Sequence, residues 1–271
     1  MNKIWFVIIC AFLMVGCNGI NKALKSNDYD YKLQVADSLY AKKKYTKAQM
    51  FYEDVFPIFK GTPKFEQIYY NWAFCSYNQK DYLNAENMFK GFVETFPNSL
   101  KVEECKYLRA YCFYKQSPKA PLDQTPTLRA ITFLQSFMMQ YPNSSRNKEA
   151  VGIIDELKAK LELKDFQNAE LYYNLGYFRA ASTSFTQLAF AYPESAKSEH
   201  YKLMVVKSTF EFANNSIEDK QLERYKTVVN ECNDFIDRFP ESELLSDVQK
   251  LKSTSEIKIK TIENEQVKTP A

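Results

Sequence analysis

The chain has 271 residues, of which 45% are hydrophobic and 25% are charged, a balance typical of a folded soluble protein. Its formal net charge of +3 gives no electrostatic basis for binding nucleic acid, so we predict no nucleic-acid partner. Only 6 glycines accompany 19 tyrosines and 21 phenylalanines, and this scarcity favours helices over turn-rich β-structure.

The first 16 residues have the pattern of a secretory signal peptide. One positive charge at Lys3 precedes an apolar run over residues 4–15, which is shorter than the roughly 20 residues of a membrane span. Gly16 and Cys17 follow, and a small residue before Cys resembles the bacterial lipoprotein signal, in which the Cys is acylated and becomes the new N-terminus. We therefore predict lipidation at Cys17. The alternative is a plain signal peptide with a chance cysteine.

The same resemblance predicts where the protein is held. The residue after Cys17 is Asn18 and not Asp, which in bacterial lipoproteins suits delivery to the outer membrane. We expect a lipid anchor on the periplasmic face, because several acyl chains hold a soluble domain on a bilayer. Residues 17–28 are expected to form a polar, lipidated tether.

A short phrase recurs along residues 29–262 and divides them into repeats. It consists of an aromatic residue, Pro, Asn or Glu, and Ser, at residues 96–99, 141–144, 192–195 and 239–242, with the prolines 45, 51 and 47 residues apart. Proline cannot continue a helix, because it lacks the N–H and clashes with the preceding turn. We expect the Asn or Ser to cap the helix that follows.

Alanines at a constant spacing indicate the position and the apolar face of the helix that precedes each phrase. Ala85, Ala130 and Ala181 each lie twelve residues before a proline, and large apolar residues follow them at +4 and +7 on one helix face. The pattern predicts helix pairs at 29–41 with 45–59, 64–79 with 82–96, 100–116 with 126–141, 147–174 with 177–192, and 196–214 with 219–238. A helix near 243–262 is expected to cap the open end, followed by a disordered tail over residues 263–271.

This arrangement resembles the tetratricopeptide (TPR) repeat, a helix–turn–helix unit with fixed small and aromatic positions. In the second pair, Trp72, Tyr82, Ala85, Phe89 and Pro97 fall in the TPR register. We therefore predict an all-α, right-handed TPR-like solenoid of about five helix–turn–helix repeats with a C-terminal capping helix. An ordinary helical bundle with chance aromatic–proline turns is the alternative.

We find no group of residues in the sequence with the pattern of a catalytic or metal-binding site. The chain has one histidine, His200, and no Cys-x-x-Cys or phosphate-binding glycine loop, so we predict no catalytic residue, no metal site, no cofactor and no enzyme activity. Carboxylate pairs such as Glu103 and Glu104 are interpreted as solvated helix surface. We expect four small buried thiols, with any disulfide pairing left open, at Cys75, Cys105, Cys112 and Cys232.

The first helix of each TPR pair lines a concave face on which peptides dock. Aromatic rings with polar tips suit this task, because they bury area at low entropy cost and still form hydrogen bonds. The predicted peptide-binding groove consists of Tyr40, Tyr70, Phe74, Tyr77, Asn78, Tyr107, Tyr111 and Tyr114, with Leu33 and Asp37 at equivalent positions of the first helix. The alternative for each ring is a place in the core.

Two segments of the chain resemble a known family closely. One is Leu-Arg-Ala-Tyr-Cys-Phe-Tyr at 108–114 with Leu-Asp-Gln-Thr at 122–125, and the other runs from Ala169 through Gly176 to the phrase at 192–195. With a lipoprotein cysteine followed almost directly by five repeats, they resemble BamD, the TPR lipoprotein of the β-barrel assembly machinery.

The resemblance implies a function and partners. The first three repeats would receive unfolded outer-membrane protein precursors, and the last two would dock a BamA-like barrel subunit through its periplasmic domains. The alternatives are another TPR lipoprotein scaffold, for example in cell division or at the peptidoglycan, and a SusD-like glycan-binding partner of an outer-membrane transporter.

Overall fold

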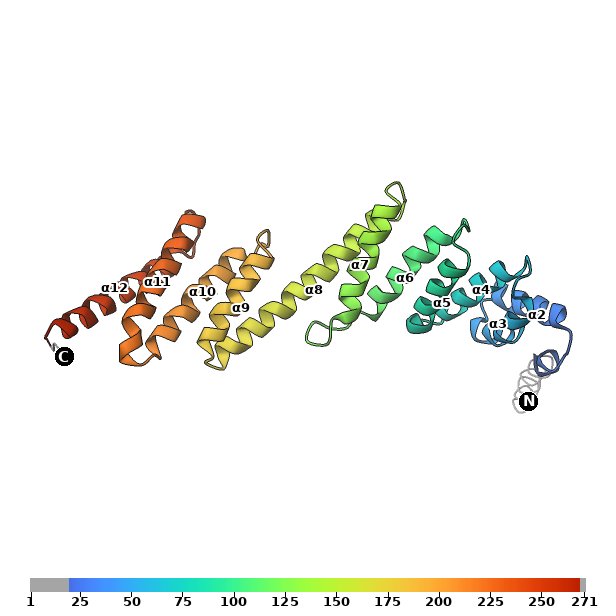
Figure 1. Ribbon diagram of the computed structural model, residues 1–271, viewed down its shortest axis with the longest axis horizontal. Coiled ribbons are helices and arrows are strands. Elements are labelled where there is room, and N and C mark those ends of the chain that lie inside the picture. The colour runs from blue at the N-terminus through green and yellow to red at the C-terminus, as the bar shows by residue number, and fades with distance from the viewer. Residues whose placement is uncertain (1–19, 269–271) are drawn as a thin grey trace, which may run out of the picture. The chain divides into compact units, whose positions relative to one another are not determined.

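The computed structural model describes residues 20–268, with side chains through residue 265, and these form two compact units that divide between Leu157 and Lys158. Cys17 and the predicted signal peptide lie outside the described residues. Within residues 20–268 every regular element is a helix. Figure 1 shows these helices following one another as antiparallel pairs within each unit. They are α2 (Tyr29–Ala41), α3 (Tyr45–Phe59), α4 (Phe65–Asn78), α5 (Tyr82–Thr95), α6 (Val102–Gln116), α7 (Thr125–Gln140), α8 (Asn147–Asn174), α9 (Phe178–Ala191), α10 (Ser198–Asn214), α11 (Glu218–Arg238) and α12 (Leu245–Lys268).

The first unit is built from consecutive helices that bury their apolar faces against one another. Each helix from α2 to α6 packs on the next one in the chain. The repeated alanines are fully buried at Ala48, Ala85 and Ala130, so a neighbouring helix approaches closely there. The rings that follow them, among them Phe89 and Phe92, fill the space between the pairs. The alanine register therefore predicts the core, and the TPR-like helical repeat is confirmed.

The second unit repeats this construction with fewer aromatic rings. Ala169 of α8 and Ala181 of α9 are fully buried beside Phe185, and Tyr201 of α10 closes that cluster. Helices α10, α11 and α12 enclose a further cluster around Val228, Phe235 and Val248. Helix α12 thus covers the apolar side of the last pair, which is the role predicted for a capping helix.

The repeated aromatic–proline phrase is a β-turn, and its serine does not cap the next helix as predicted. In the first copy, the Phe96 N–H donates to the Phe92 carbonyl and ends α5, and the Ser99 N–H donates to the Phe96 carbonyl across the proline. Ser99 lies three residues before α6, so its Oγ accepts from the Lys101 N–H at 3.1 Å within the turn. The hydroxyl itself donates to Glu66 at the start of α4, at 2.8 Å.

This serine–glutamate link recurs at every copy of the phrase. The serine donates to a glutamate of the preceding first helix, which lies in the first turn of α4, α6 and α10 and in the middle of the longer α8, in the pairs Ser99–Glu66, Ser144–Glu103, Ser195–Glu162 and Ser242–Glu199. Each link ties the turn after one pair to the first helix of that same pair. The serines therefore hold the repeat spacing, and Glu103 is not the merely solvated carboxylate that the sequence suggested.

Both ends of the predicted repeat domain differ from expectation. Residues 20–24 are helical, and Ala23 is only 2% exposed in the cluster of α2 and α3, so this part of the predicted tether is packed structure. At the other end, α12 continues to Lys268, beyond the predicted limit of 262 and into the predicted disordered tail. No Gly or Pro interrupts residues 245–268, Ile262 packs on the last cluster, and Glu263 pairs with Lys226 at 3.0 Å.

The four described cysteines are free and buried, as predicted. Burial raises the thiol pKa of each to about 12. At neutral pH they are uncharged and act as small apolar side chains.

Candidate functional site

Five aromatic rings on α4 and α6 form a continuous row, here called the aromatic strip: Tyr70, Phe74, Tyr77, Tyr111 and Tyr114. Ring centroids lie 4.6 Å apart for Tyr70 and Phe74 and 6.0 Å apart for Phe74 and Tyr77. The row crosses to α6 through Tyr77 and Tyr111 at 6.3 Å and ends at Tyr114, 5.5 Å further. Spacings of three and four residues place each set on one helix face, so the two helices contribute to one surface.

The strip is half-buried, with one side on the core and one side open. Phe74 and Tyr77 pack against the fully buried ring of Phe89 at 5.5 and 6.1 Å, and Tyr70 packs against Phe92 at 5.9 Å. All five rings keep partial exposure to solvent. Packing on the core therefore holds these rings in place, so they lose little rotational freedom when a ligand binds.

Glutamates accept from the hydroxyls at the two ends of the strip. Tyr70 donates to Glu104 at 2.5 Å, and Tyr114 donates to Glu156 of α8 at 2.8 Å. Burial and then the Glu104 hydrogen bond raise the pKa of Tyr70, while the Glu156 hydrogen bond is the main cause of the raised pKa of Tyr114. Both phenols therefore stay protonated at neutral pH and remain hydrogen-bond donors.

Two lysines lie over the same rings. Lys101 Nζ is 5.2 Å from the centroid of Tyr70, and Lys115 Nζ is 5.0 Å from the centroids of Tyr111 and Tyr114. These are cation–π distances. The strip thus offers ring faces bordered by both acidic and basic groups, a surface suited to peptides with aromatic and polar side chains.

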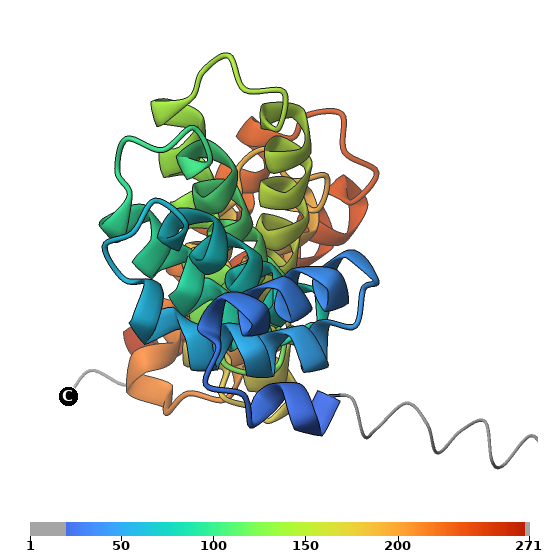
Figure 2. The same cartoon turned by 90° about the vertical axis from the view of Figure 1, so that its right-hand side faces the viewer.

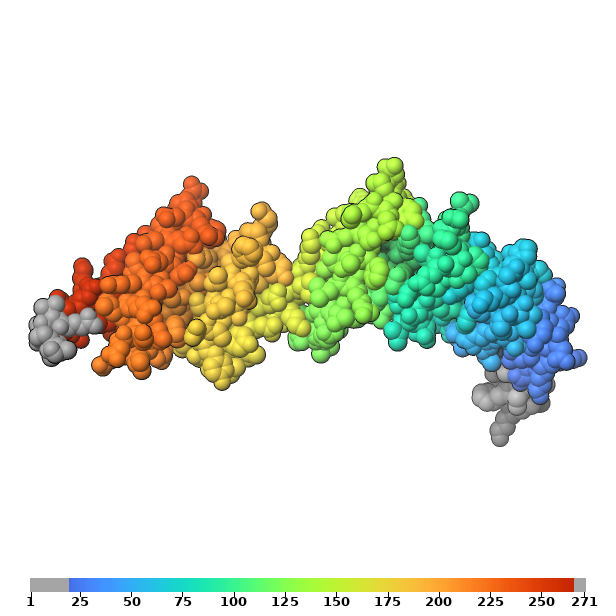
Figure 3. Space-filling model, viewed as in Figure 1, coloured from blue at the N-terminus to red at the C-terminus, as the bar shows by residue number. Residues whose placement is uncertain are grey.

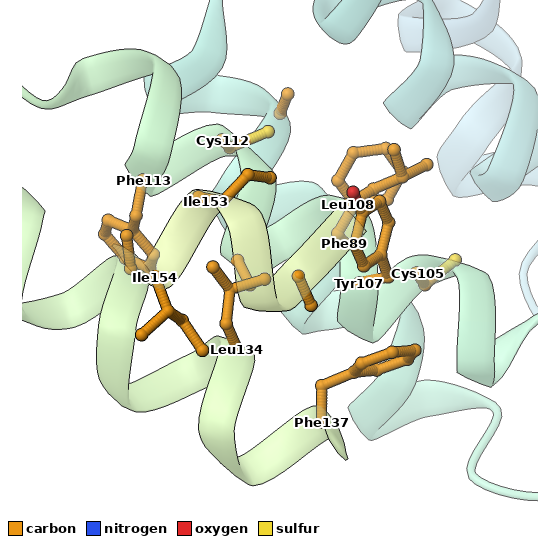
Figure 4. Close-up of a cluster of buried hydrophobic side chains, with 14 of the residues drawn as sticks. Phe89, Cys105, Tyr107, Leu108, Cys112, Phe113, Leu134, Phe137, Ile153 and Ile154 are labelled. Atoms are coloured by element: carbon orange, nitrogen blue, oxygen red, sulfur yellow. The ribbon is translucent and has the colours of Figure 1, made fainter. Parts of the chain in front are cut away.

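Tyr107 is a correction to the predicted groove. It is 2% exposed, and its ring packs against Phe137 at 5.4 Å beneath the Arg146 guanidinium at 5.0 Å. Figure 4 shows it within the buried cluster that includes Phe89 and Phe137. Helical spacing places it in line with Tyr111, but the start of α8 covers this end of α6. It belongs to the core.

Two other predicted residues lie apart from the strip. Tyr40 makes ring contacts with Tyr45 and Tyr52, at 5.7 and 6.3 Å, in the first helix pair. Burial, with smaller contributions from neighbouring groups that include Glu104, raises its pKa to about 12. Asn78 is exposed at the end of α4, and its amide donates to the Phe74 carbonyl at 2.7 Å.

A surface hollow of about 300 Å³ lies between α2 and α4, and the sequence revealed only part of it. Asp37 lines it and accepts from Tyr52 at 2.7 Å, and Asn71 donates to Tyr52 at 3.1 Å. The remaining lining residues are Asp30, Leu33, Gln34, Lys64, Gln67 and Ile68. Gln34 and Gln67 share helix faces with predicted residues, but an isolated polar residue gave no reason to choose them.

The second unit has an exposed apolar surface at the end of α8 and the start of α9, here called the α8–α9 surface. Its exposed members are Leu171, Tyr172, Leu175 and Tyr177, which are 42–62% exposed. A hollow of about 710 Å³ adjoins it, lined also by Phe178, Arg179 and Phe212. Figure 3 shows the α8–α9 turn, in yellow, projecting at the lower edge of this unit. Such a concentration of exposed apolar side chains marks a protein-binding site more often than free surface.

The motif residues that carry the family resemblance serve packing. Arg109 pairs with Glu86 at 2.8 Å and lies 4.2 Å from the ring of Phe133, so it joins α5, α6 and α7. Gln124 is buried and donates to the Lys119, Ala120 and Leu122 carbonyls at 3.0–3.2 Å. It organises the inserted loop before α7.

Two further properties of the described residues bear on the site. No three His, Cys, Asp or Glu side chains among them lie together as metal ligands, and none of their helices is long and apolar enough to cross a membrane. His200 lies in the first turn of α10 with its ring centroid 5.9 Å from that of Phe166, and this partial desolvation, followed by the charge of Lys207, lowers its pKa.

Stacked helical hairpins that expose a row of fixed rings define a protein of the TPR-type binding class. Residues 30–205 match the model of the YfiO family, described as an outer membrane lipoprotein, and this is more than half of the chain. The chain therefore belongs to the YfiO family of BamD-like lipoproteins.

Comparisons beyond the family are distant. No curated protein matches the chain in sequence. The TPR2AB domain of yeast Sti1, solved as a pHSP90 complex, is 10% identical with a TM-score of 0.38, and the match covers 84% of this chain and 98% of that one. A TPR protein of Thermus thermophilus is 14% identical with a TM-score of 0.33, and the match covers 84% of this chain and 99% of that one.

Proposed function

We propose that this protein is a lipid-anchored component of the β-barrel assembly machinery, which binds unfolded outer-membrane protein precursors and a BamA-like barrel subunit. Binding, and not catalysis, is its task. Membership of an outer membrane lipoprotein family supports the location, and the aromatic strip supports peptide binding. The proposed anchor is Cys17 on the periplasmic face of the outer membrane.

The aromatic strip supports the proposed binding of unfolded precursors. Strands of a β-barrel alternate residues that face lipid with residues that face the lumen, so an unfolded precursor presents an aromatic or aliphatic side chain at every second position. Rings held on Phe89 and Phe92 receive such side chains at low entropy cost. The binding residues are Tyr70, Phe74, Tyr77, Tyr111 and Tyr114, while the core residue Tyr107 is excluded.

Peptide binding tests this placement. The variant Tyr70→Ala, Phe74→Ala, Tyr111→Ala should bind an extended peptide with alternating aromatic residues at least about tenfold more weakly, because hot-spot rings each contribute about 2 kcal/mol or more. Fluorescence anisotropy of a labelled peptide measures the Kd, and circular dichroism checks that the helices persist. A peptide with alanines in place of its rings should bind weakly to both proteins.

A matched variant in the other unit supplies the control. Tyr172→Ala, Tyr177→Ala, Phe190→Ala removes three exposed rings that are outside the strip, so peptide affinity should be unchanged. Loss of binding in the control, or full binding by the strip variant, would contradict the placement. The milder Tyr111→Ala variant keeps the test open if the triple variant fails to fold.

The α8–α9 surface is proposed as the docking site of the barrel subunit. The resemblance places that contact in the last two repeats, and Tyr172 and Tyr177 are the exposed rings there. Replacing both by Glu should abolish co-purification of the assembly pore in mild detergent while leaving peptide affinity intact, since the strip is untouched. If a nutrient transporter co-purified instead, the SusD-like alternative would be supported.

The anchor has its own test. Cys17→Ser should release the protein into the soluble periplasmic fraction, because no acyl chain remains to hold it. Retention of this variant in the membrane fraction would overturn the assignment of Cys17.

A further inference from the structure

The described chain begins close to the proposed anchor. Residues 20–24 form a helical turn whose Ala23 is buried, and Ile20 and Leu24 pack on the cluster of α2 and α3. Figure 2 shows this turn, in dark blue, running beside α2 and α3. Cys17 precedes it by three residues, and an extended residue spans at most about 3.6 Å. An acylated Cys17 would therefore hold the start of this helical turn, at Ile20, within about 11 Å of the bilayer surface.

Two segments at this end of the protein are basic, and residues 28–37 between them carry Asp28, Asp30 and Asp37. Residues 20–27 and 38–52 contain six lysines and no acidic residue, whereas the rest of the chain has a formal net charge of −3 because the whole has +3. We call these lysines the basic end: Lys22, Lys25, Lys42, Lys43, Lys44 and Lys47. All six are exposed, and none forms an ion pair with a described residue.

The α2–α3 turn keeps its lysine side chains available. The N–H groups of Lys42, Lys43 and Lys44 donate to the last carbonyls of α2 at 2.8–3.2 Å, with Lys43 in the left-handed region at a φ of 56°. The backbone thus satisfies the helix end by itself. The ammonium groups are not needed as hydrogen-bond donors there and extend into solvent.

We propose that the basic end docks on the anionic phospholipid headgroups of the bilayer that holds acylated Cys17. This inference rests on the proposed anchor at Cys17, and it adds the orientation of the anchored protein on the bilayer. A basic patch beside an acyl chain supplies the second attachment that stable membrane binding requires, and each lysine near an anionic surface strengthens partitioning about fivefold. The α2–α3 turn faces the membrane as a result.

Vesicle sedimentation of the chain from residue 18 onward, which lacks the lipid but retains every described residue, tests the docking. It should bind vesicles of phosphatidylethanolamine with phosphatidylglycerol, and bind vesicles of phosphatidylethanolamine with phosphatidylcholine at least about tenfold more weakly. Replacing Lys42, Lys43, Lys44 and Lys47 by Gln should lower the partition coefficient on anionic vesicles by about tenfold or more. A control removes the same charge from exposed lysines of the second unit, Lys220, Lys250, Lys258 and Lys260, and should bind as the unaltered chain does.

Equal loss in the two variants would overturn the proposal, because a general charge effect would then explain the binding. Vesicle binding by the unaltered chain should also weaken as salt is raised from about 0.05 to about 0.5 M, because the screening length shrinks severalfold over that range. Binding that stays constant over this range would overturn the proposal as well. The mass of the N-terminal peptide from membrane-extracted protein tests the anchor separately. A missing acyl group would refute the anchor, while lysine-dependent vesicle binding would still support the docking surface.

Discussion

Replacing Gly91 by alanine tests how α4, which carries three rings of the aromatic strip, is held against α5. A Cβ at Gly91 would lie 2.0 Å from the Tyr69 hydroxyl oxygen and 3.2 Å from its Cζ. Carbon contacts are favourable near 3.5–4.0 Å, so the tip of the ring has to move by more than about 1 Å. The rings of Phe56 and Phe92, whose centroids lie 4.9 and 6.0 Å from that of Tyr69, restrict this movement.

Two opposing effects set the magnitude. Alanine in a helix interior is more favourable than glycine by about 1 kcal/mol, whereas overpacking a core costs about 1–3 kcal/mol. Gly91→Ala should therefore lower the free energy of unfolding by about 1 kcal/mol. In a Tyr69→Phe background the nearest ring atom is Cζ, which has to give way by only a few tenths of an ångström. There Gly91→Ala should raise the stability by up to about 1 kcal/mol.

Urea unfolding followed by Trp72 fluorescence measures both effects. Trp72 is the one tryptophan among residues 20–268, and its ring lies 4.7 Å from Phe56 and 6.4 Å from Tyr69, so it reports on this contact. The double-mutant cycle should give a coupling of about 2 kcal/mol between Gly91 and Tyr69. If Gly91→Ala had the same effect in both backgrounds, the close approach of α5 to Tyr69 would not be what requires glycine.

Three further predictions concern the packing that supports the site. Ser99→Ala should cost about 1 kcal/mol at neutral pH, because Glu66 loses a hydrogen bond to its carboxylate. That hydrogen bond, followed by Lys101, lowers the pKa of Glu66. The stability that this hydrogen bond contributes is therefore fully present above the ordinary carboxyl pKa and is lost as pH falls through the lowered value. The cost of Ser99→Ala should shrink in acid for the same reason. Cys75 and the three other described thiols should resist Ellman's reagent until the protein unfolds, since burial raises their pKa to about 12. Lys202→Ala should lower stability by about 2 kcal/mol in urea unfolding, because Glu231 and a second α11 carboxylate lose their shared cation.

Each of these has an outcome that contradicts it. A Ser99→Ala cost that stays constant from neutral pH to acid would mean that the Glu66 charge is not involved. Fast labelling of any described thiol in the native protein would show that its helix pair opens. A Lys202→Ala variant that unfolds at the same urea concentration as the unaltered chain would assign that ion cluster no net stability.

The sequence by itself determined where the helices lie. Proline disfavours the continuation of a helix, and in each of the four phrases it follows the last aromatic residue of an apolar face, so the phrases predicted the ends of α5, α7, α9 and α11 to within two residues. The alanine register predicted which side of each second helix is buried, because helical periodicity assigns a face from spacing alone. The rings of the aromatic strip were likewise found from spacings of three and four residues.

Only the tertiary structure decided what covers each face. Tyr107 and Tyr111 share one helix face in sequence, yet the start of α8 buries Tyr107 and leaves Tyr111 partly open. Ser99 resembles a helix cap in sequence, but its hydroxyl reaches Glu66, which lies 33 residues earlier. Residues 20–24 and α12 gained their order from apolar contacts with α3 and α11. Periodicity fixes the direction in which a side chain points, whereas burial depends on which distant segment packs there, and local sequence does not encode that contact.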